Sequence, residues 1–139
     1  MNTIKFIFRK IIYSPFLLVQ IWKAENALKE KDWQKLSDTV ESVHRRGFIF
    51  DKSRFWLGSA LLRLERNEEA LIQFEKISDE LDSIEEEATR HWNHALALYR
   101  NGHTTKSVDL LKEKISSNWP DHTYNKARQF LSDEDISIH

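Results

Sequence analysis

Residues 51–75 read DKSRFWLGSALLRLERNEEALIQFE, and this stretch decides the fold. Its apolar residues recur at spacings of three and four, which is the period of a helix with a buried face rather than the alternation of a half-buried strand. Arg66 and Asn67 interrupt the pattern, and Asn67 offers a side-chain acceptor ahead of two glutamates, as a helix start requires. The stretch therefore predicts two helices, over 52–65 and 68–79, joined by a short turn.

The same spacing continues outward almost everywhere, and strict alternation is sustained nowhere. Only three Gly and two Pro occur in 139 residues, too few for the many tight turns of an all-β chain. The expected fold class is therefore all-α. The polar, Gly and Pro breaks predict eight helices, over residues 3–12, 15–30, 33–46, 52–65, 68–79, 84–100, 104–117 and 120–132.

Composition narrows the class of protein. A chain of 139 residues with 40% hydrophobic and 31% charged residues fits one folded domain, and it is neither disordered nor a multi-span membrane protein by composition. Cysteine is absent, which excludes disulfides and thiolate metal sites and makes the cytoplasm the expected location. No Gly-rich loop of the phosphate-binding kind occurs.

Charge is balanced overall but divided along the chain. Residues 1–63 carry 12 bases and 6 acids, whereas residues 64–139 carry 9 bases and 16 acids. Ten of the acids lie in the run from Glu65 to Glu87, which is typical of a solvated face. Because the whole chain has a net charge of −1, a nucleic-acid partner is not expected.

The N-terminal segment combines three bases, Lys5, Arg9 and Lys10, with an apolar stretch over 11–22. That stretch is too short for a bilayer span of about 20 apolar residues. We expect a helix over 1–13 that caps a helical core. The alternative is a basic amphipathic helix that rests on a membrane surface.

An internal repeat organises the chain. A shift of 34 residues aligns the apolar and small positions of 21–43 with those of 55–77, and a further shift of 37 carries these onto 92–114. Ala24, Gly58 and Ala95 are equivalent small residues that allow one helix to approach its neighbour closely. Since a single pair cannot bury its apolar face, the repeat predicts three stacked pairs with covering helices at both ends.

The middle copy resembles the tetratricopeptide repeat family, whose 34-residue helix-turn-helix motif reads W-x₂-L-G-x₂-Y, then A-x₃-F, then P. The residues that match are Leu57 and Gly58 for the Leu-Gly pair, Leu61 for the Tyr, and Ala70 with Phe74 for A-x₃-F, while Arg54 replaces the leading Trp. The resemblance covers about residues 18–120. It implies an α-solenoid in one domain spanning 1–139, with helix pairs over 15–46, 51–79 and 84–117 and capping helices over 1–13 and 120–132.

The resemblance also implies a binding groove, because the first helices of such pairs line a concave face that takes a peptide or a partner helix. The implied partner-binding residues are Lys52, Phe55, Ser59, Leu62, Arg63, Trp92, Leu96, Tyr99 and Arg100. Arg63 and Arg100 occupy equivalent positions, so a partner with acidic groups is expected. Ile21 and Glu25 stand where some family members carry the Lys and Asn of a carboxylate clamp, which disfavours that mode of binding.

Residues that could carry chemistry are present but lack a supporting pattern. His91 and His94 lie three apart on one expected helix, yet no local acid completes a metal-binding motif, and we expect no metal and no cofactor. Ser14, Ser53 and Ser59 lack the GxSxG setting of a nucleophile. Enzymatic activity is therefore not expected. Most of the five tryptophans are expected in the core or in packing between repeats, including Trp22, which aligns with Trp56 at the 34-residue shift.

The expected function is a non-catalytic protein–protein interaction module, acting as an adaptor, chaperone or inhibitor. Two alternatives stay open. One is an immunity protein that neutralises a bacterial toxin by direct binding, which the small size and opposed charges suit. The other is a membrane-peripheral scaffold that uses the basic N-terminal segment. The sequence leaves open the partner, the oligomeric state, and whether the groove or the Glu65–Glu87 face is the main contact surface.

Overall fold

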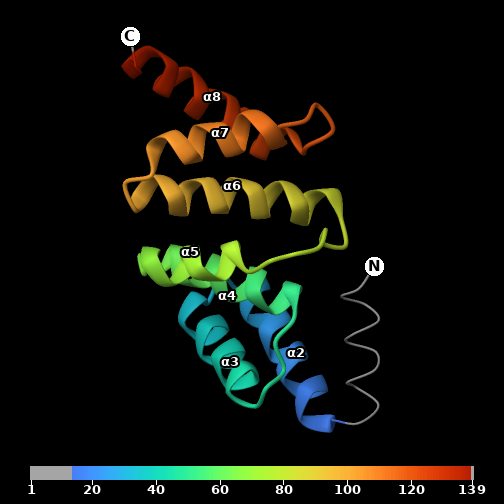
Figure 1. The fold of residues 1–139 in the computed structure, drawn as a ribbon. Coiled ribbons are helices and arrows are strands. Elements are labelled where there is room, and N and C mark those ends of the chain that lie inside the picture. The colour runs from blue at the N-terminus through green and yellow to red at the C-terminus, as the bar shows by residue number, and fades with distance from the viewer. Residues whose placement is uncertain (1–13, 139) are drawn as a thin grey trace. The chain divides into compact units, whose positions relative to one another are not determined.

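The computed structural model describes residues 14–138, and the side chains of residues 14–134. This part of the chain contains helices and no strand, so the all-α prediction is confirmed for it (Figure 1). The helices are α2 (Pro15–Lys29), α3 (Trp33–Arg45), α4 (Asp51–Arg63), α5 (Asn67–Glu75), α6 (Ile84–Arg100), α7 (Thr104–Lys114) and α8 (Asp121–Ile138). The expected helix over 3–12 lies outside the described residues.

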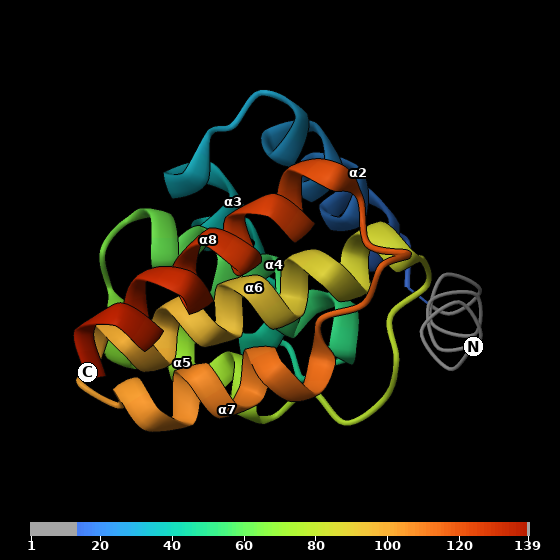
Figure 2. The same cartoon turned by 90° about the horizontal axis from the view of Figure 1, so that it is seen from above.

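The contacts divide the chain into two compact units, one ending at Asp82 and the other beginning at Ser83. In the first unit α3 packs against both α2 and α4, and α5 packs against α4. In the second unit α7 and α8 both pack against α6 (Figure 2). The helices α7 and α8 also contact each other. No helix among residues 14–138 combines the length and the apolar composition needed to cross a bilayer.

One turn geometry joins α2 to α3, α4 to α5 and α6 to α7, and it also follows α3, where Gly47 has a φ of 86° and the Phe48 N–H donates to the Val43 carbonyl at 3.2 Å. Lys31, Glu65 and Gly102 follow α2, α4 and α6, and all three have a positive φ, of 56°, 61° and 83°. In each turn the next residue donates its N–H to the carbonyl five residues earlier, at 2.9 Å for Asp32 to Ala27, 2.9 Å for Arg66 to Leu61 and 2.8 Å for His103 to Leu98. This is the Schellman pattern of helix ends. The three turns are 34 and 37 residues apart, which is the register of the sequence repeat.

Small residues face large ones inside the pairs. Gly58 on α4 lies against the ring of Phe74 on α5, which is 1% exposed. The equivalent small residues Ala24 and Ala95 are also buried. In the second unit the Ser107 hydroxyl on α7 donates to the Ala95 carbonyl at 2.7 Å, which joins α7 to α6 with a buried hydrogen bond.

Local capping explains where several helices begin. Ser14 Oγ accepts from the Leu17 N–H at 3.3 Å, and Pro15 occupies the first turn of α2, where no donor is needed. Ser83 Oγ accepts from the Glu86 N–H at 3.1 Å at the start of α6. The expected cap at Asn67 is wrong: Asn67 is the first residue of α5 and Arg66 is its N-cap. The Arg66 N–H donates to the Leu61 carbonyl in the Schellman turn, and the Arg66 carbonyl accepts from the Ala70 N–H as the first bond of α5.

Three expected helix ends are also wrong. The helix α5 stops at Glu75 rather than at 79, because the residues after it bond to the start of α4. Arg54 donates to the Lys76 carbonyl at 2.7 Å, and the Asp51 carboxylate accepts from the Ser78 and Asp79 N–H groups at 3.3 and 3.1 Å. The helix α7 stops at Lys114 rather than at 117, and α8 runs to Ile138 rather than to 132.

Candidate functional site

The predicted binding residues of the first unit are mostly enclosed. Phe55, Ser59 and Leu62 are 7%, 8% and 3% exposed, so they offer little surface to a partner. Lys52 pairs with Asp82 at 3.2 Å and is partly buried. Arg63 is exposed, and its guanidinium lies 5.2 Å from the centroid of the Trp33 ring. Of this set, Arg63 therefore has the most accessible side chain.

The predicted residues of the second unit are more accessible. Trp92 and Leu96 are half-buried on α6, whereas Tyr99 is 41% exposed and Arg100 is exposed. Residues at spacings of four and three share one face of a helix. Trp92, Leu96 and Tyr99 thus form a stripe along α6 that ends beside a guanidinium group.

A residue that the sequence reasoning missed completes this stripe. Phe130 on α8 meets Trp92 edge to face, with ring centroids 6.0 Å apart, and meets Tyr99 in the same way at 5.2 Å. Phe130 is itself half-buried. The three rings form one aromatic cluster that joins α6 to α8. The sequence assigned 120–132 to a cap, and the apolar residues of that helix were the signal that it also shapes a surface.

An open hollow of about 510 Å³ lies beside the cluster, entirely within the second unit. It is lined by Trp92 from α6 and by His122, Asn125, Lys126, Gln129, Phe130 and Asp133 from α8. Two aromatic rings thus lie among amide, ammonium and carboxylate groups. This composition suits a peptide, whose backbone offers hydrogen-bonding groups and whose side chains include apolar ones.

Burial lowers the pKa of both histidines of α6. Burial and the neighbouring Arg90 lower the pKa of His94 to about 4. Burial first and then Arg90 also lower the pKa of His91, while Glu87, 3.1 Å from its Nε2, acts in the opposite direction. The His91 ring stacks on Trp119 at 6.3 Å. Among the described residues, no three His, Asp or Glu side chains come close enough together to hold a metal ion.

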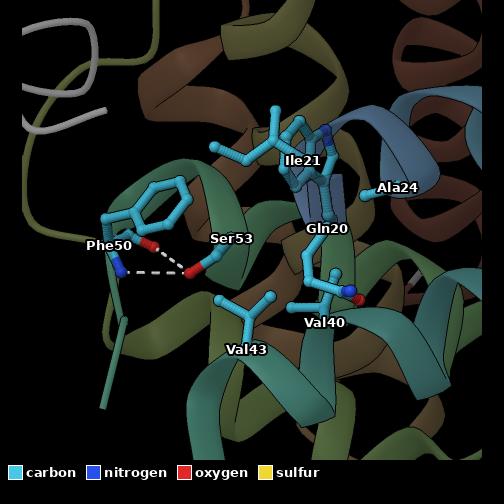
Figure 3. Close-up of a pocket in the computed structure, with 8 residues that line it drawn as sticks. Gln20, Ile21, Ala24, Val40, Val43, Phe50 and Ser53 are labelled. Atoms are coloured by element: carbon cyan, nitrogen blue, oxygen red, sulfur yellow. Dashed lines mark hydrogen bonds between the residues drawn. The ribbon is translucent and has the colours of Figure 1, made fainter. Parts of the chain in front are cut away.

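A second polar cluster lies in the first unit. Ser53 Oγ accepts from the Phe50 N–H at 3.0 Å and lies 2.7 Å from the Phe50 carbonyl (Figure 3). The same hydroxyl lies 2.8 Å from His44 Nε2, and burial together with Arg54 lowers the pKa of His44 to about 4. A serine beside a neutral imidazole resembles a nucleophile with its base. Here Ser53 is 1% exposed, so the pair closes the start of α4 and is sealed from any substrate.

The cavity next to Ser53 confirms how closed this region is. Its volume is about 10 Å³, roughly that needed for one water molecule, and its walls are mainly apolar side chains of α2, α3 and α4 (Figure 3). Trp56 forms part of the wall and is buried, as expected.

The expectation that Trp22 is also buried is wrong. Trp22 is 64% exposed, because it lies on the face of α2 opposite to Ile21 and Ala24.

The acidic run is a solvated face in its first part. Its members from Glu65 to Glu80 all have exposed side chains, and Asp82 instead pairs with Lys52. Arg66 bonds to Glu69 and also approaches Glu41 of α3 at 3.5 Å. These contacts tie part of the run to the surface of its own unit.

Comparison of the chain with models of protein families, with curated proteins and with solved structures finds no match. The function is therefore inferred from the geometry of the described residues.

Proposed function

We propose that this protein is a non-catalytic interaction module of the tetratricopeptide type, which captures a segment of another protein on the partly exposed surface that α6 and α8 form. One observation carries the proposal: Trp92, Tyr99 and Phe130 form a partly exposed aromatic cluster beside an open hollow. Clusters of this kind anchor protein partners, because a few aromatic and Arg side chains supply most of the binding free energy of an interface.

The repeated turns support the tetratricopeptide assignment. Three helix pairs joined by the same Schellman turn, in a register of 34 and 37 residues, are what a degenerate three-copy array of that motif would contain. The close approach of Gly58 to Phe74 supports the same assignment, since Gly and Phe occupy the small and large positions of the motif.

The chemistry around the cluster indicates the class of ligand. Arg100 ends the stripe on α6, and Lys126 lines the hollow, so two cations flank the rings. Asn125 and Gln129 supply amide groups that can bond to an extended or helical backbone. We therefore propose a ligand that places an apolar side chain on the rings and a carboxylate near Arg100 or Lys126.

The test uses the whole chain as bait in affinity capture from its native cells, followed by mass spectrometry and by titration of the identified partner. The triple variant Trp92→Ala, Tyr99→Ala and Arg100→Ala should lose the partner while circular dichroism stays unchanged. A matched control, Lys106→Ala with Asp109→Ala on the exposed side of α7, should retain it. Retention of the partner by the triple variant would reject this site.

A further inference from the structure

The helix α2 carries a second apolar surface that the proposed function does not use. Leu18, Val19 and Trp22 are 49%, 48% and 64% exposed, and we call these three residues the Trp22 face. Their spacing of one and three residues keeps them on one side of the helix, away from the buried Leu17 and Ile21. Trp22 is the most exposed large apolar side chain in the described part of the chain.

Charged groups of both signs lie beside the Trp22 face, because Glu25 follows Trp22 by three residues and is exposed on the same side of α2. Lys23 is exposed on the same helix. At the start of α2 the Arg46 guanidinium lies 4.2 Å from the centroid of the Phe16 ring, which brings a second cation to this end of the helix. In the sequence, residues 1–24 contain Lys5, Arg9, Lys10 and Lys23 and no acidic residue. The first acid is Glu25, and Lys29 lies one turn beyond it.

The area of the Trp22 face favours a lipid surface over a second copy of the chain as its binding partner. Three half-exposed side chains offer on the order of 300 Å² of apolar surface, well below the roughly 800 Å² per partner of a standard protein interface. A second copy docked through this face alone would therefore bind weakly. A lipid surface needs no complementary partner area, because each inserted side chain and each nearby cation contributes separately.

The chemistry of the side chains fits the same occupant. Tryptophan is favoured at the boundary between lipid and water, where its ring is buried and its N–H remains hydrated. Each Lys or Arg near an anionic bilayer strengthens binding to it. We propose that the Trp22 face, with Lys23 and Arg46 at its rim, rests on the surface of a membrane that contains anionic lipids.

Flotation of the full-length protein with vesicles tests this proposal. The protein should float with vesicles of phosphatidylcholine and phosphatidylserine, and should stay in the bottom fraction with phosphatidylcholine alone. Raising the salt concentration from about 0.1 M to about 1 M should release it, since the screening length falls from about 10 Å to about 3 Å.

Paired variants locate the contact. Leu18→Gln with Trp22→Gln should reduce flotation at least tenfold without adding charge. The control Ile72→Gln changes a residue on α5 that is 49% exposed, like Leu18, and should leave flotation unchanged. Circular dichroism establishes that both variants are folded.

Three results would overturn the proposal. The first is a wild-type protein that does not float with anionic vesicles. The second is a double variant that floats as well as the wild type, which would assign the contact to another part of the chain. The third is a concentration-dependent dimer that the Leu18→Gln and Trp22→Gln variant abolishes, which would assign the face to a second copy.

Discussion

Gly58 lies so close to Phe74 that a Cβ atom built on residue 58 would be 3.0 Å from the Phe74 Cζ atom. The Phe74 ring is 1% exposed, so it has little room to move away. The absence of a side chain at position 58 thus sets how closely α4 and α5 pack.

Gly58→Ala should lower the free energy of unfolding by about 1 to 3 kcal/mol, because overpacking at the Phe74 ring outweighs the gain of about 1 kcal/mol in helix propensity. Urea denaturation measures the change. Adding Phe74→Leu should recover part of the loss, since the smaller side chain frees space. A Gly58→Ala variant more stable than the wild type would mean that the ring adjusts freely.

The repeated turns allow a test in opposite directions. Lys31 and Glu65 hold a positive φ with side chains that disfavour it, so Lys31→Gly and Glu65→Gly should each raise the unfolding free energy by about 0.5 to 1 kcal/mol. Gly102→Ala should lower it by about 1 kcal/mol through backbone strain alone, because nothing lies within 4 Å of the added Cβ. Thermal unfolding of the three variants measures these changes. Changes in unfolding free energy of the same sign and size in all three variants would contradict the prediction.

Acid should destabilise the first unit through His44. The pKa of His44 is about 4 in the folded state, against an ordinary value of 6.5, so between these pH values the unfolded chain binds more protons. The free energy of unfolding should therefore fall as the pH drops from 6.5 to 4, by about 1 to 3 kcal/mol for this ring, and should not change on its account above pH 7.

The variant His44→Gln isolates that contribution. It should flatten the dependence of unfolding free energy on pH between 6.5 and 4, whatever its effect on stability at pH 7. His91 and His94 have pKa values shifted in the same direction, so they contribute to the slope that remains. If wild type and variant show the same slope, the His44 ring has the same pKa in the folded protein as in the unfolded chain.

The aromatic cluster should depend on Phe130 for binding. Phe130→Ala removes the ring that contacts both Trp92 and Tyr99, so affinity for the captured partner should fall at least tenfold. Leu131→Ala is the matched control: Leu131 is the next residue on α8, is also half-buried, and does not line the hollow. Isothermal titration compares the two, and an equal loss would mean that both act by loosening α8.

Burial at the candidate site was the part least accessible to sequence reasoning. The family register placed Phe55, Ser59 and Leu62 on an open groove, yet α4 is buried at every position from Phe55 to Leu62. A signal was present, since SRFWLGSALL has no polar face, and a helix that is apolar all round is usually enclosed. The register of the repeat shows which positions are equivalent. It does not show how deeply the residue at each of these positions is buried.

Within the described residues, the sequence by itself determined which segments form helices and where most of the turns between them lie. The expected helix over 84–100 matches α6 at both ends, because Ser83 caps its start and Gly102 permits the Schellman turn after it, and both effects act within a few residues. Only the tertiary structure decided which rings face water and which meet. Trp119 is 6% exposed and Trp22 is 64% exposed, and Phe130 reaches Tyr99 from 31 residues away. Such outcomes depend on which helix packs against each face, and local spacing carries no information about that.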